Sequence, residues 1–215
     1  MVLKLYGFPL STCTRRVRVV LAEKGLEDEF HSVDLTKGEQ KAESYLNNLQ
    51  PFGKVPVLHD TETGIQIFES RAITQYIANK YSGQGAQIAP PESDLKAWAL
   101  YQQALSIEQS YFDPVVSEIA YEKVLKARKG HGETDEARVK FLLSQLDLTL
   151  KGYERVLSKQ RYLAGEQVTV ADLAHLPYGV FVEPFGFAEL LPKYPHVQKW
   201  WEELKARESW KKVTA

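Results

Sequence analysis

The sequence lacks several features that would each point to a particular class of protein. Cys13 is the single cysteine among 215 residues, which excludes an intrachain disulfide and a cysteine-cluster metal site. No run approaches the roughly 20 apolar residues of a membrane span, and the first residues do not have the pattern of a signal peptide. With 27 basic and 28 acidic side chains the formal charge is −1, so no attraction to nucleic acid is expected. We therefore expect a soluble, cytoplasmic protein that binds neither nucleic acid nor membrane.

The chain nevertheless contains enough apolar material for a folded core. Hydrophobic residues make up 44% of it and aromatic residues 11%, which excludes a mainly disordered protein. Residues 1–82 alternate short β-like runs with helical stretches, whereas residues 92–215 carry almost only helical periodicity. Residues 83–91 contain two glycines, two prolines and no charge, as linkers do. The sequence therefore predicts two domains joined by a short linker.

The first half predicts the order βαβ followed by ββα, which indicates a mixed four-stranded sheet with helices. The predicted strands are Val2–Tyr6, Phe30–Val33, Val55–Leu58 and Ile65–Phe68, and the predicted helices begin at Ser11, Glu39 and Ser70. The second half predicts a long helix from Asp94 that continues, with a bend near Pro114, to about Ala127. Further helices are predicted over Glu136–Leu157, Thr169–Leu176 and His196–Arg207.

A series of short motifs resembles the glutathione transferases, and the phi class in particular. The segment Gly7–Val17 (GFPLSTCTRRV) is similar to the active-site turn of that class, and further similar segments follow in the same order, at Gly38–Lys41, Leu49–Pro56, Phe68–Ala72, Phe112–Pro114, Tyr162–Gly165, Ala171–Leu173 and Arg207–Lys212. The resemblance covers essentially the whole chain. It implies a thioredoxin-like N-terminal domain, an all-helical C-terminal domain and a homodimer. It also implies glutathione as cosubstrate, with no permanently bound cofactor.

Ser11 is the candidate catalytic residue. From its position before a helix it is a plain N-cap, since serine there accepts a hydrogen bond from a free backbone N–H. The resemblance implies more, because the matching serine of phi-class enzymes donates a hydrogen bond to the sulfur of glutathione and favours the thiolate. Arg15 and Arg16 follow one turn later. Either they strengthen the positive field of the helix end or they form surface salt bridges.

Two neighbouring residues compete for the role of Ser11. Tyr6 lies near the end of the first strand, where other glutathione transferases place a tyrosine, but its position here favours the core. Cys13 matches the catalytic cysteine of related thiol-transferring classes. However, Cys13 shares a helical face with Val17, Val20 and Leu21, which predicts a buried and unreactive thiol.

Glutathione carries a carboxylate at each end and a peptide-like middle. The resemblance assigns the middle to the backbone of Val55 before Pro56, a proline that is cis in this family. It assigns the γ-glutamyl end to Glu69 and Ser70, where a helix begins. Gln40, Lys41 and Lys54 are the candidates for the glycine carboxylate. The phi class usually has histidine in place of Gln40 and often glutamine in place of Lys54, so these two contacts depart from the family pattern.

An apolar site for the second substrate is expected between the two halves. Its candidate residues are Leu10, Thr12, Leu35, Ile107, Tyr111, Phe112 and Tyr178. Phe52 stands between a proline and a glycine in a turn, and related dimers insert an aromatic residue from about this point into the partner subunit. Thr169 and Asp172 have the spacing of a capping box, so Asp172 is predicted to be structural. The five histidines have no metal-ligand spacing, and no metal site is expected.

The resemblance thus implies an enzyme that conjugates the thiolate of glutathione to small hydrophobic electrophiles, in detoxification and stress response. It also implies a glutathione-dependent peroxidase activity on organic hydroperoxides. Three alternatives stay open. The first is a thiol transferase or dehydroascorbate reductase that depends on Cys13, and the second is a carrier of hydrophobic ligands without catalysis. The third is a structural module of a larger assembly, against which the complete predicted glutathione site argues.

Overall fold

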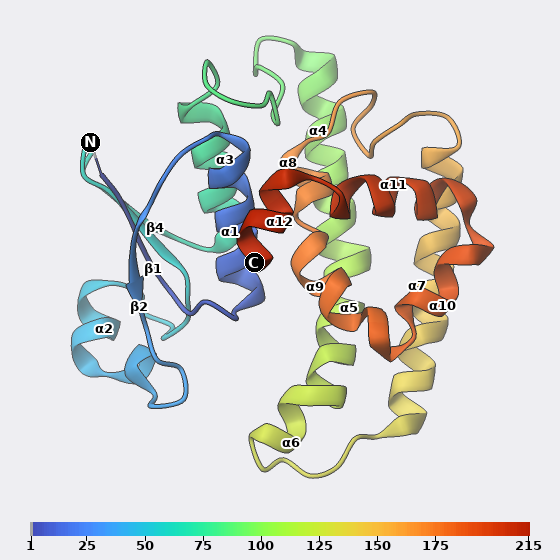
Figure 1. The fold of residues 1–215 in the computed structure, drawn as a ribbon, viewed down its shortest axis with the longest axis horizontal. Coiled ribbons are helices and arrows are strands. Elements are labelled where there is room, and N and C mark those ends of the chain that lie inside the picture. The colour runs from blue at the N-terminus through green and yellow to red at the C-terminus, as the bar shows by residue number, and fades with distance from the viewer. Residues whose placement is uncertain (1) are drawn as a thin grey trace. The chain divides into compact units, whose positions relative to one another are not determined.

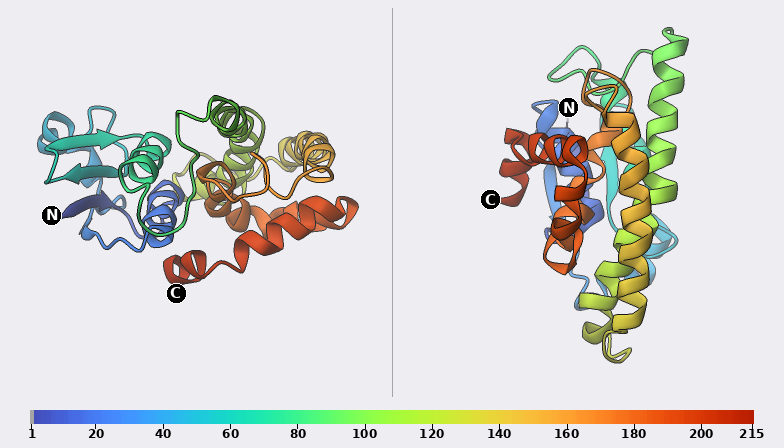
Figure 2. Two further views of the ribbon diagram at one scale, coloured as in Figure 1. Left: turned by 90° about the horizontal axis from the view of Figure 1, so that it is seen from above. Right: turned by 90° about the vertical axis from the view of Figure 1, so that its right-hand side faces the viewer.

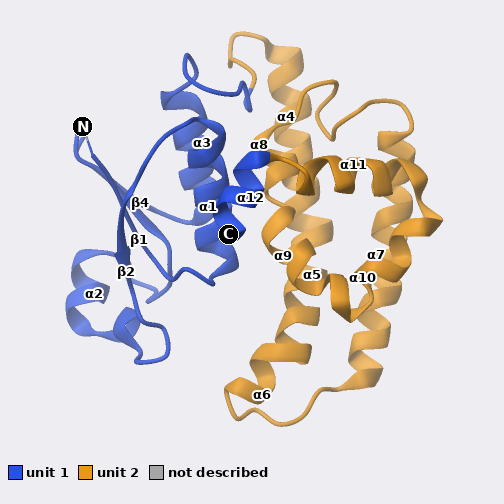
Figure 3. Cartoon of the chain, viewed as in Figure 1, with its two compact units in different colours: residues 1–89, 208–215 blue, residues 90–207 orange. Residues whose placement is uncertain are grey.

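The computed structural model describes residues 2–215 and divides them into two compact units (Figure 3). One unit comprises the chain up to Ala89 together with Glu208–Ala215, and the other comprises Pro90–Arg207. The division differs at both ends from the predicted ranges 1–82, 83–91 and 92–215. The reason is that the linker and the last helix both pack on the first unit. Met1 lies outside the described residues.

The first unit is built on a mixed four-stranded sheet, as the sequence predicts. Its strands are β1 (Leu3–Gly7), β2 (Glu29–Ser32), β3 (Val57–Asp60) and β4 (Ile65–Phe68), in the spatial order β2-β1-β3-β4. β1 runs parallel to β2 and antiparallel to β3, and β3 runs antiparallel to β4. The βαβ–ββα order and the thioredoxin-like sheet are therefore confirmed.

Alternation along the strands directs side chains to helices on both faces of the sheet. Leu5 and Leu58 pair across β1 and β3 and are fully buried. On the opposite face Val57 packs in a cluster with Tyr45, which belongs to α2 (Glu43–Asn48), a helix preceded by the 3₁₀ turn η1 (Glu39–Lys41). Figure 1 shows α1 (Thr12–Glu23) and α3 (Ser70–Lys80) side by side, with the strands between them and α2.

The predicted linker and the C-terminal helix both attach to the end of α1. The buried Lys24 donates from Nζ to the carbonyl of Ala86 at 2.7 Å. A Cβ on Gly85 would come within 2.6 Å of the Glu23 carbonyl oxygen, so this approach requires glycine. In α12 (Glu208–Thr214), Trp210 is buried and Ser209 hydrogen-bonds the Glu23 carboxylate. These contacts place α12 with the sheet domain.

The second unit is made of helices, as predicted. They are α4 (Leu95–Ile107), α5 (Asp113–Ala120), α6 (Lys126–Arg128), α7 (Glu136–Leu157), α8 (Val170–Leu173), α9 (Leu176–Val182), α10 (Phe187–Leu190) and α11 (Pro195–Lys205). Short 3₁₀ turns, η4 (Glu183–Phe185) and η5 (Leu191–Lys193), flank α10. Figure 2 (right) shows the long α7 running beside α5.

The long helix predicted from Asp94 to Ala127 forms, but two π-helical segments interrupt it. They are η2 (Glu108–Phe112) and η3 (Tyr121–Leu125), and they separate α4, α5 and α6. Pro114 lies in the first turn of α5, directly after the π-helical segment η2. Within residues 2–215, no helix combines the length and apolar character needed to cross a membrane.

Candidate active site

The register of the sheet brings three connecting segments together at the same end of the strands. Tyr6 at the end of β1 pairs with Val57 at the start of β3, and Val57 pairs in turn with Phe68 at the end of β4. The turn before α1, the segment before β3 and the turn before α3 therefore leave the sheet next to one another. These three segments contain Ser11, Val55–Pro56 and Glu69–Ser70, so the fold gathers most of the residues predicted for glutathione.

Ser11 is the N-cap of α1. Its backbone is extended, and its Oγ accepts a hydrogen bond from the Thr14 N–H at 3.3 Å. A serine hydroxyl that accepts in this way still has its own proton to donate. Gly7 fixes the approach to the turn, because a Cβ there would lie 2.7 Å from Cγ2 of Thr14. The capping role and a role as hydrogen-bond donor are therefore compatible at Ser11.

Cys13 and Arg16 differ from the sequence predictions. Cys13 is only half-buried, whereas Val17, Val20 and Leu21 are buried as predicted. Cys13 lies in the first turn of α1, and the guanidinium of Arg16 approaches its Sγ to 3.7 Å. Arg16 itself is 1% exposed, which excludes the predicted alternative of a surface salt bridge for this residue. Its Nη1 donates to the Ser70 Oγ at 2.9 Å.

The peptide bond between Val55 and Pro56 is cis, as the family resemblance implies. The loop before it is held by two buried side chains. Oε1 of Gln50 accepts from the N–H groups of Phe52 and Lys54, at 2.7 and 3.2 Å. The Tyr45 hydroxyl donates to the Lys54 carbonyl at 2.8 Å, and burial raises the pKa of Tyr45 to about 12, so this donor stays protonated. Sequence reasoning missed both supporting residues, because their role depends on the loop that they hold.

The three residues predicted for the glycine carboxylate come from η1 and from the loop before β3. Lys41 donates from Nζ to the Phe52 carbonyl at 3.2 Å, which links these two segments. Gly53 lies so close to η1 that a Cβ on it would be 2.7 Å from the Gln40 carbonyl oxygen. Oε1 of Gln40 is buried without a hydrogen-bond partner, while Lys54 is exposed. Gln40, Lys41 and Lys54 therefore share one side of the unit.

The turn before α3 has an unusual backbone. Glu69 has φ = 71° and is the only non-glycine residue with positive φ among residues 2–215. Such a conformation is uncommon outside glycine, and residues that adopt it cluster at active sites and ligand-binding turns. Ser70 follows as the first residue of α3 and is buried, while Glu69 is exposed. The first N–H groups of α3, with the positive end of its dipole, are suited to an anion.

The residues predicted for the apolar substrate occupy different environments in their own units. In the first unit Leu10 is 66% exposed, Thr12 is half-buried, and Leu35 packs against the cluster of Val33, Tyr45 and Val57.

In the second unit Phe112 is buried against the rings of Tyr153, His175 and Phe187, so the structure places it in the core and not in a pocket wall. Tyr178 is half-buried. Ile107 and Tyr111 line an apolar groove of about 500 Å³ between the α4–η2 segment and α7.

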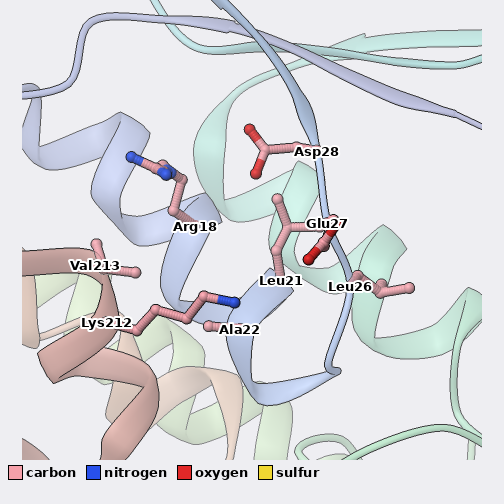
Figure 4. Close-up of a pocket in the computed structure, with 8 residues that line it drawn as sticks. All are labelled: Arg18, Leu21, Ala22, Leu26, Glu27, Asp28, Lys212 and Val213. Carbon is pink, nitrogen blue, oxygen red and sulfur yellow. The ribbon is translucent and has the colours of Figure 1, made fainter.

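A hollow in the first unit lies apart from the predicted site residues (Figure 4). It has a volume of about 240 Å³ and is bordered by α1, by the segment after α1 and by α12. Burial raises the pKa of Asp28 in its wall, and the nearby charge of Arg18 opposes that rise. Arg18 also stacks over the ring of Phe30, with 5.3 Å from Cζ to the centroid. Arg18 therefore lines this hollow, although it lies only two residues from Arg16 in the sequence.

Within residues 2–215, no group of three or more histidine, cysteine, aspartate and glutamate side chains is placed to hold a metal ion. The predicted capping box is present and closed. The Thr169 side chain caps the N–H of Asp172, and the Asp172 carboxylate accepts from the Thr169 N–H at 2.8 Å. Asp172 is fully buried, which supports the structural interpretation.

Comparison with known proteins gives the same answer over both units. Residues 1–79 match the family model of the glutathione S-transferase N-terminal domain, and residues 109–208 match the model of the C-terminal domain. Glutathione S-transferase PM239X14 of Arabidopsis thaliana is 48% identical, covering 92% of this chain and 89% of its own length. The crystal structure of glutathione transferase F7 from Populus trichocarpa superimposes with a TM-score of 0.92 at 38% identity, covering 99% of this chain and 98% of its own. The complex of maize glutathione S-transferase I with an atrazine glutathione conjugate has a TM-score of 0.89 at 31% identity, covering 99% and 96%.

Proposed function

The chain belongs to the glutathione S-transferase family, in its phi class, and from this premise we propose that Ser11 activates the thiol of glutathione for transfer to a small hydrophobic electrophile. The observation that carries the proposal is the state of the Ser11 hydroxyl. Its oxygen accepts from the Thr14 N–H, so its proton is available to a sulfur at the N-terminus of α1. The sulfur of glutathione is then the nucleophile, and Ser11 forms no covalent bond.

The energies of these interactions are sufficient. Lowering the pKa of a thiol by ~2 units, from about 8.5, requires ~2.7 kcal/mol of preference for the thiolate. A hydrogen bond to a charged group contributes ~1.5–3 kcal/mol. The positive end of a helix adds ~0.3–1 kcal/mol. One hydroxyl at one helix end therefore accounts for the activation.

The tripeptide is held by the segments before α1, β3 and α3, which lie together at one end of the strands. The backbone of Val55, before the cis Pro56, pairs with the cysteinyl unit in the manner of an added strand. Ser70 binds the γ-glutamyl carboxylate, and Glu69 pairs with the ammonium group beside it. Gln40, Lys41 and Lys54 bind the glycine carboxylate, and the unpartnered Oε1 of Gln40 accepts an N–H of the ligand.

The thiolate attacks an electrophilic carbon, forms the C–S bond and displaces a leaving group such as chloride. The maize relative that holds an atrazine glutathione conjugate supports an apolar second substrate of this size. Leu10, Thr12, Leu35 and Tyr178 remain the residues proposed to contact it. With organic hydroperoxides the thiolate attacks the terminal peroxide oxygen and releases the alcohol. A second glutathione then yields the disulfide and water. Such an enzyme serves detoxification in the cytoplasm.

Two variants, Ser11→Ala and Cys13→Ser, test the catalytic assignment. Ser11→Ala should lower kcat/KM for conjugation of a chlorinated nitrobenzene about 100-fold at mildly acidic pH, because two pKa units change the thiolate fraction by that factor. Its pH profile should shift upward toward the ordinary thiol pKa. Cys13→Ser, two residues away, should stay within about twofold of the native protein. The opposite pattern, with thiol transfer lost in Cys13→Ser, would establish the cysteine-dependent alternative. Binding of apolar dyes without any turnover would establish the carrier.

Phe52 is the proposed contact between two subunits. Its side chain is 65% exposed in the loop before β3, where it is accessible to a second copy. The groove between α4–η2 and α7 is mainly apolar and contains two further exposed hydrophobic side chains, Tyr111 and Leu148. We assign this groove to the Phe52 ring of a second copy, which makes Ile107 and Tyr111 dimer residues instead of electrophile contacts.

Sedimentation of single variants tests this dimer. Phe52→Ala should shift the protein toward monomer by at least about tenfold in dissociation constant, since a buried aromatic anchor contributes 2 kcal/mol or more. Leu148→Ala in the groove should have the same direction. Leu95→Ala is the control, because Leu95 is also an exposed leucine but does not line the groove. Unchanged sedimentation of Phe52→Ala would remove Phe52 from the interface.

A further inference from the structure

The buried guanidinium of Arg16 stands behind one of the proposed ligand residues. Arg16 projects from α1, and its Nη1 donates to Oγ of Ser70, the first residue of α3, at 2.9 Å. We propose that Arg16 is a positioning residue: it orients the Ser70 hydroxyl so that the hydroxyl proton is presented to a carboxylate of the substrate. This inference rests on the proposed function, because the carboxylate is that of the γ-glutamyl end of glutathione.

The direction of the hydrogen bond decides the orientation of the hydroxyl. A guanidinium has five N–H donors and no acceptor, so in this pair Ser70 can only accept. One lone pair of Oγ is thereby occupied, and the hydroxyl proton must point away from Arg16. Without the arginine the hydroxyl would rotate freely, and its Oγ could turn toward a ligand carboxylate, which repels a lone pair. Arg16 thus fixes the orientation of the Ser70 hydroxyl, which can otherwise donate or accept, so that it acts as a donor toward the ligand.

Burial makes the arginine unusual for a residue near a helix start. Arg16 is 1% exposed and Ser70 is 5% exposed. Carboxylate binding at the N-terminus of α3 would bring an anion next to this charge, on the far side of Ser70. The same charge at low exposure also acts through a lower effective dielectric than a surface lysine would.

The contact with Cys13 gives an alternative interpretation in which Arg16 only ties elements together. Its Nη1 lies 3.7 Å from the Cys13 Sγ, so the same nitrogen spans from the first turn of α1 to the first turn of α3. A purely structural tie would affect every ligand of the site alike. A positioning role affects only ligands that carry the carboxylate. Two ligands that differ in that one group therefore separate the two roles.

The experiment measures binding by titration calorimetry with glutathione and with γ-aminobutyryl-cysteinyl-glycine, which lacks the α-carboxylate and keeps the amino group. Arg16→Gln should raise the dissociation constant of glutathione about tenfold, which corresponds to about 1.4 kcal/mol. The dissociation constant of the analogue should stay within about twofold of its value for the native protein. Ser70→Ala should behave in the same way, and the double variant should be no weaker than either single one. In kinetics, Arg16→Gln should raise KM for glutathione and leave kcat unchanged at saturation.

The control is Arg18→Gln, which removes the same charge from the same helix and should bind both ligands like the native protein. Should Arg16→Gln fail to fold, Arg16→Lys replaces it. Lysine keeps the charge and a donor, and should weaken glutathione about threefold without affecting the analogue. Equal weakening of both ligands, or of neither, would overturn the positioning role. Failure of the native protein to bind glutathione would instead overturn the proposed function.

Discussion

Polar residues lie at the starts of helices in both units, but they differ in how many of their hydrogen-bonding groups have partners. In the second unit the Asp172 carboxylate accepts from Thr169 N, Thr169 Oγ1, Leu163 N and Trp200 Nε1, all between 2.8 and 3.0 Å. In the first unit, Ser11 Oγ accepts from one backbone N–H and Ser70 Oγ accepts from one guanidinium. The carboxylate is fully matched, whereas each hydroxyl has a proton left to donate. The comparison teaches that a helix cap is structural when its groups are matched and available for chemistry when a donor remains.

His175 extends the matched region of the second unit. Its Nδ1 lies 2.8 Å from the Ala171 carbonyl, which can only accept, so the neutral ring carries its proton on Nδ1. Its Nε2 then accepts from the Tyr153 hydroxyl at 2.9 Å. The ring is fully buried, and burial lowers the pKa of His175 below its ordinary value. Both ring nitrogens are thus committed to holding the helices together.

The largest effect on stability should come from removing the Asp172 carboxylate. Asp172→Ala leaves at least two buried donors without an acceptor, at about 1–3 kcal/mol each, so the free energy of unfolding should fall by about 3 kcal/mol or more. Urea denaturation followed by tryptophan fluorescence measures it. Asp94→Ala is the matched control, since Asp94 caps α4 with a single bond to the Ala97 N–H in an exposed position. It should cost only about 1 kcal/mol. Equal costs for the two variants would mean that matching does not distinguish the caps.

Acid should weaken the second unit at a higher pH than the first. The pKa of His175 is lowered in the folded state, so between that value and about 6.5 the unfolded chain binds the extra proton, and stability falls by up to about 1.4 kcal/mol per pH unit as pH decreases. In the first unit burial raises the pKa of Asp60, but hydrogen bonds from Lys80 and Tyr76 outweigh it and lower that pKa. The stability that Asp60 contributes is therefore present above about pH 3.9 and is lost only below it.

Hydrogen exchange of the two units between pH 4.5 and 6.5 checks this order. Amides of α7 and α9 should lose protection in this range, while those of β1 and β3 keep theirs. His175→Gln removes the titrating group and should flatten the dependence in the second unit, whatever its own cost in stability. Loss of protection first in β1 and β3 would contradict the assignment.

Much of this arrangement could be predicted from the sequence, because local patterns determine it. The alternation in Leu3–Gly7 and the spacing in Glu136–Leu157 predict the right elements, since each pattern reports the face that the element itself buries. The capping box at Thr169 is likewise local, with both partners within one turn. The family motifs added Ser11, whose capping role alone would not have indicated a ligand, and Ser70, which is the first residue of α3.

The remaining features depend on contacts that are distant in the chain. Arg16 is separated by 54 residues from Ser70, and a charged residue on a helix is ordinarily expected at the surface. One signal existed, because Arg16 lies three residues after Cys13 and four before Val20, on the face that the helix buries. Cys13 was predicted on that same face but is only half-buried, and in the first turn of α1 the buried residue is Thr14. The π-helical segments within Asp94–Ala127 have no sequence signature comparable to a cap or a turn.

The smallest expected effect is the stability cost of removing the open cap. The bond from Thr14 N to Ser11 Oγ is long at 3.3 Å, so Ser11→Ala should lower the free energy of unfolding by only about 0.5–1 kcal/mol, and Ser11→Gly by a few tenths. The same denaturation experiment as for Asp172 measures both. If Ser11→Ala cost about 3 kcal/mol, its loss of conjugation would reflect damage to α1, and Ser11 would belong with the matched caps of the second unit. A small cost together with a large loss of activity assigns the loss to the proton that Ser11 no longer donates.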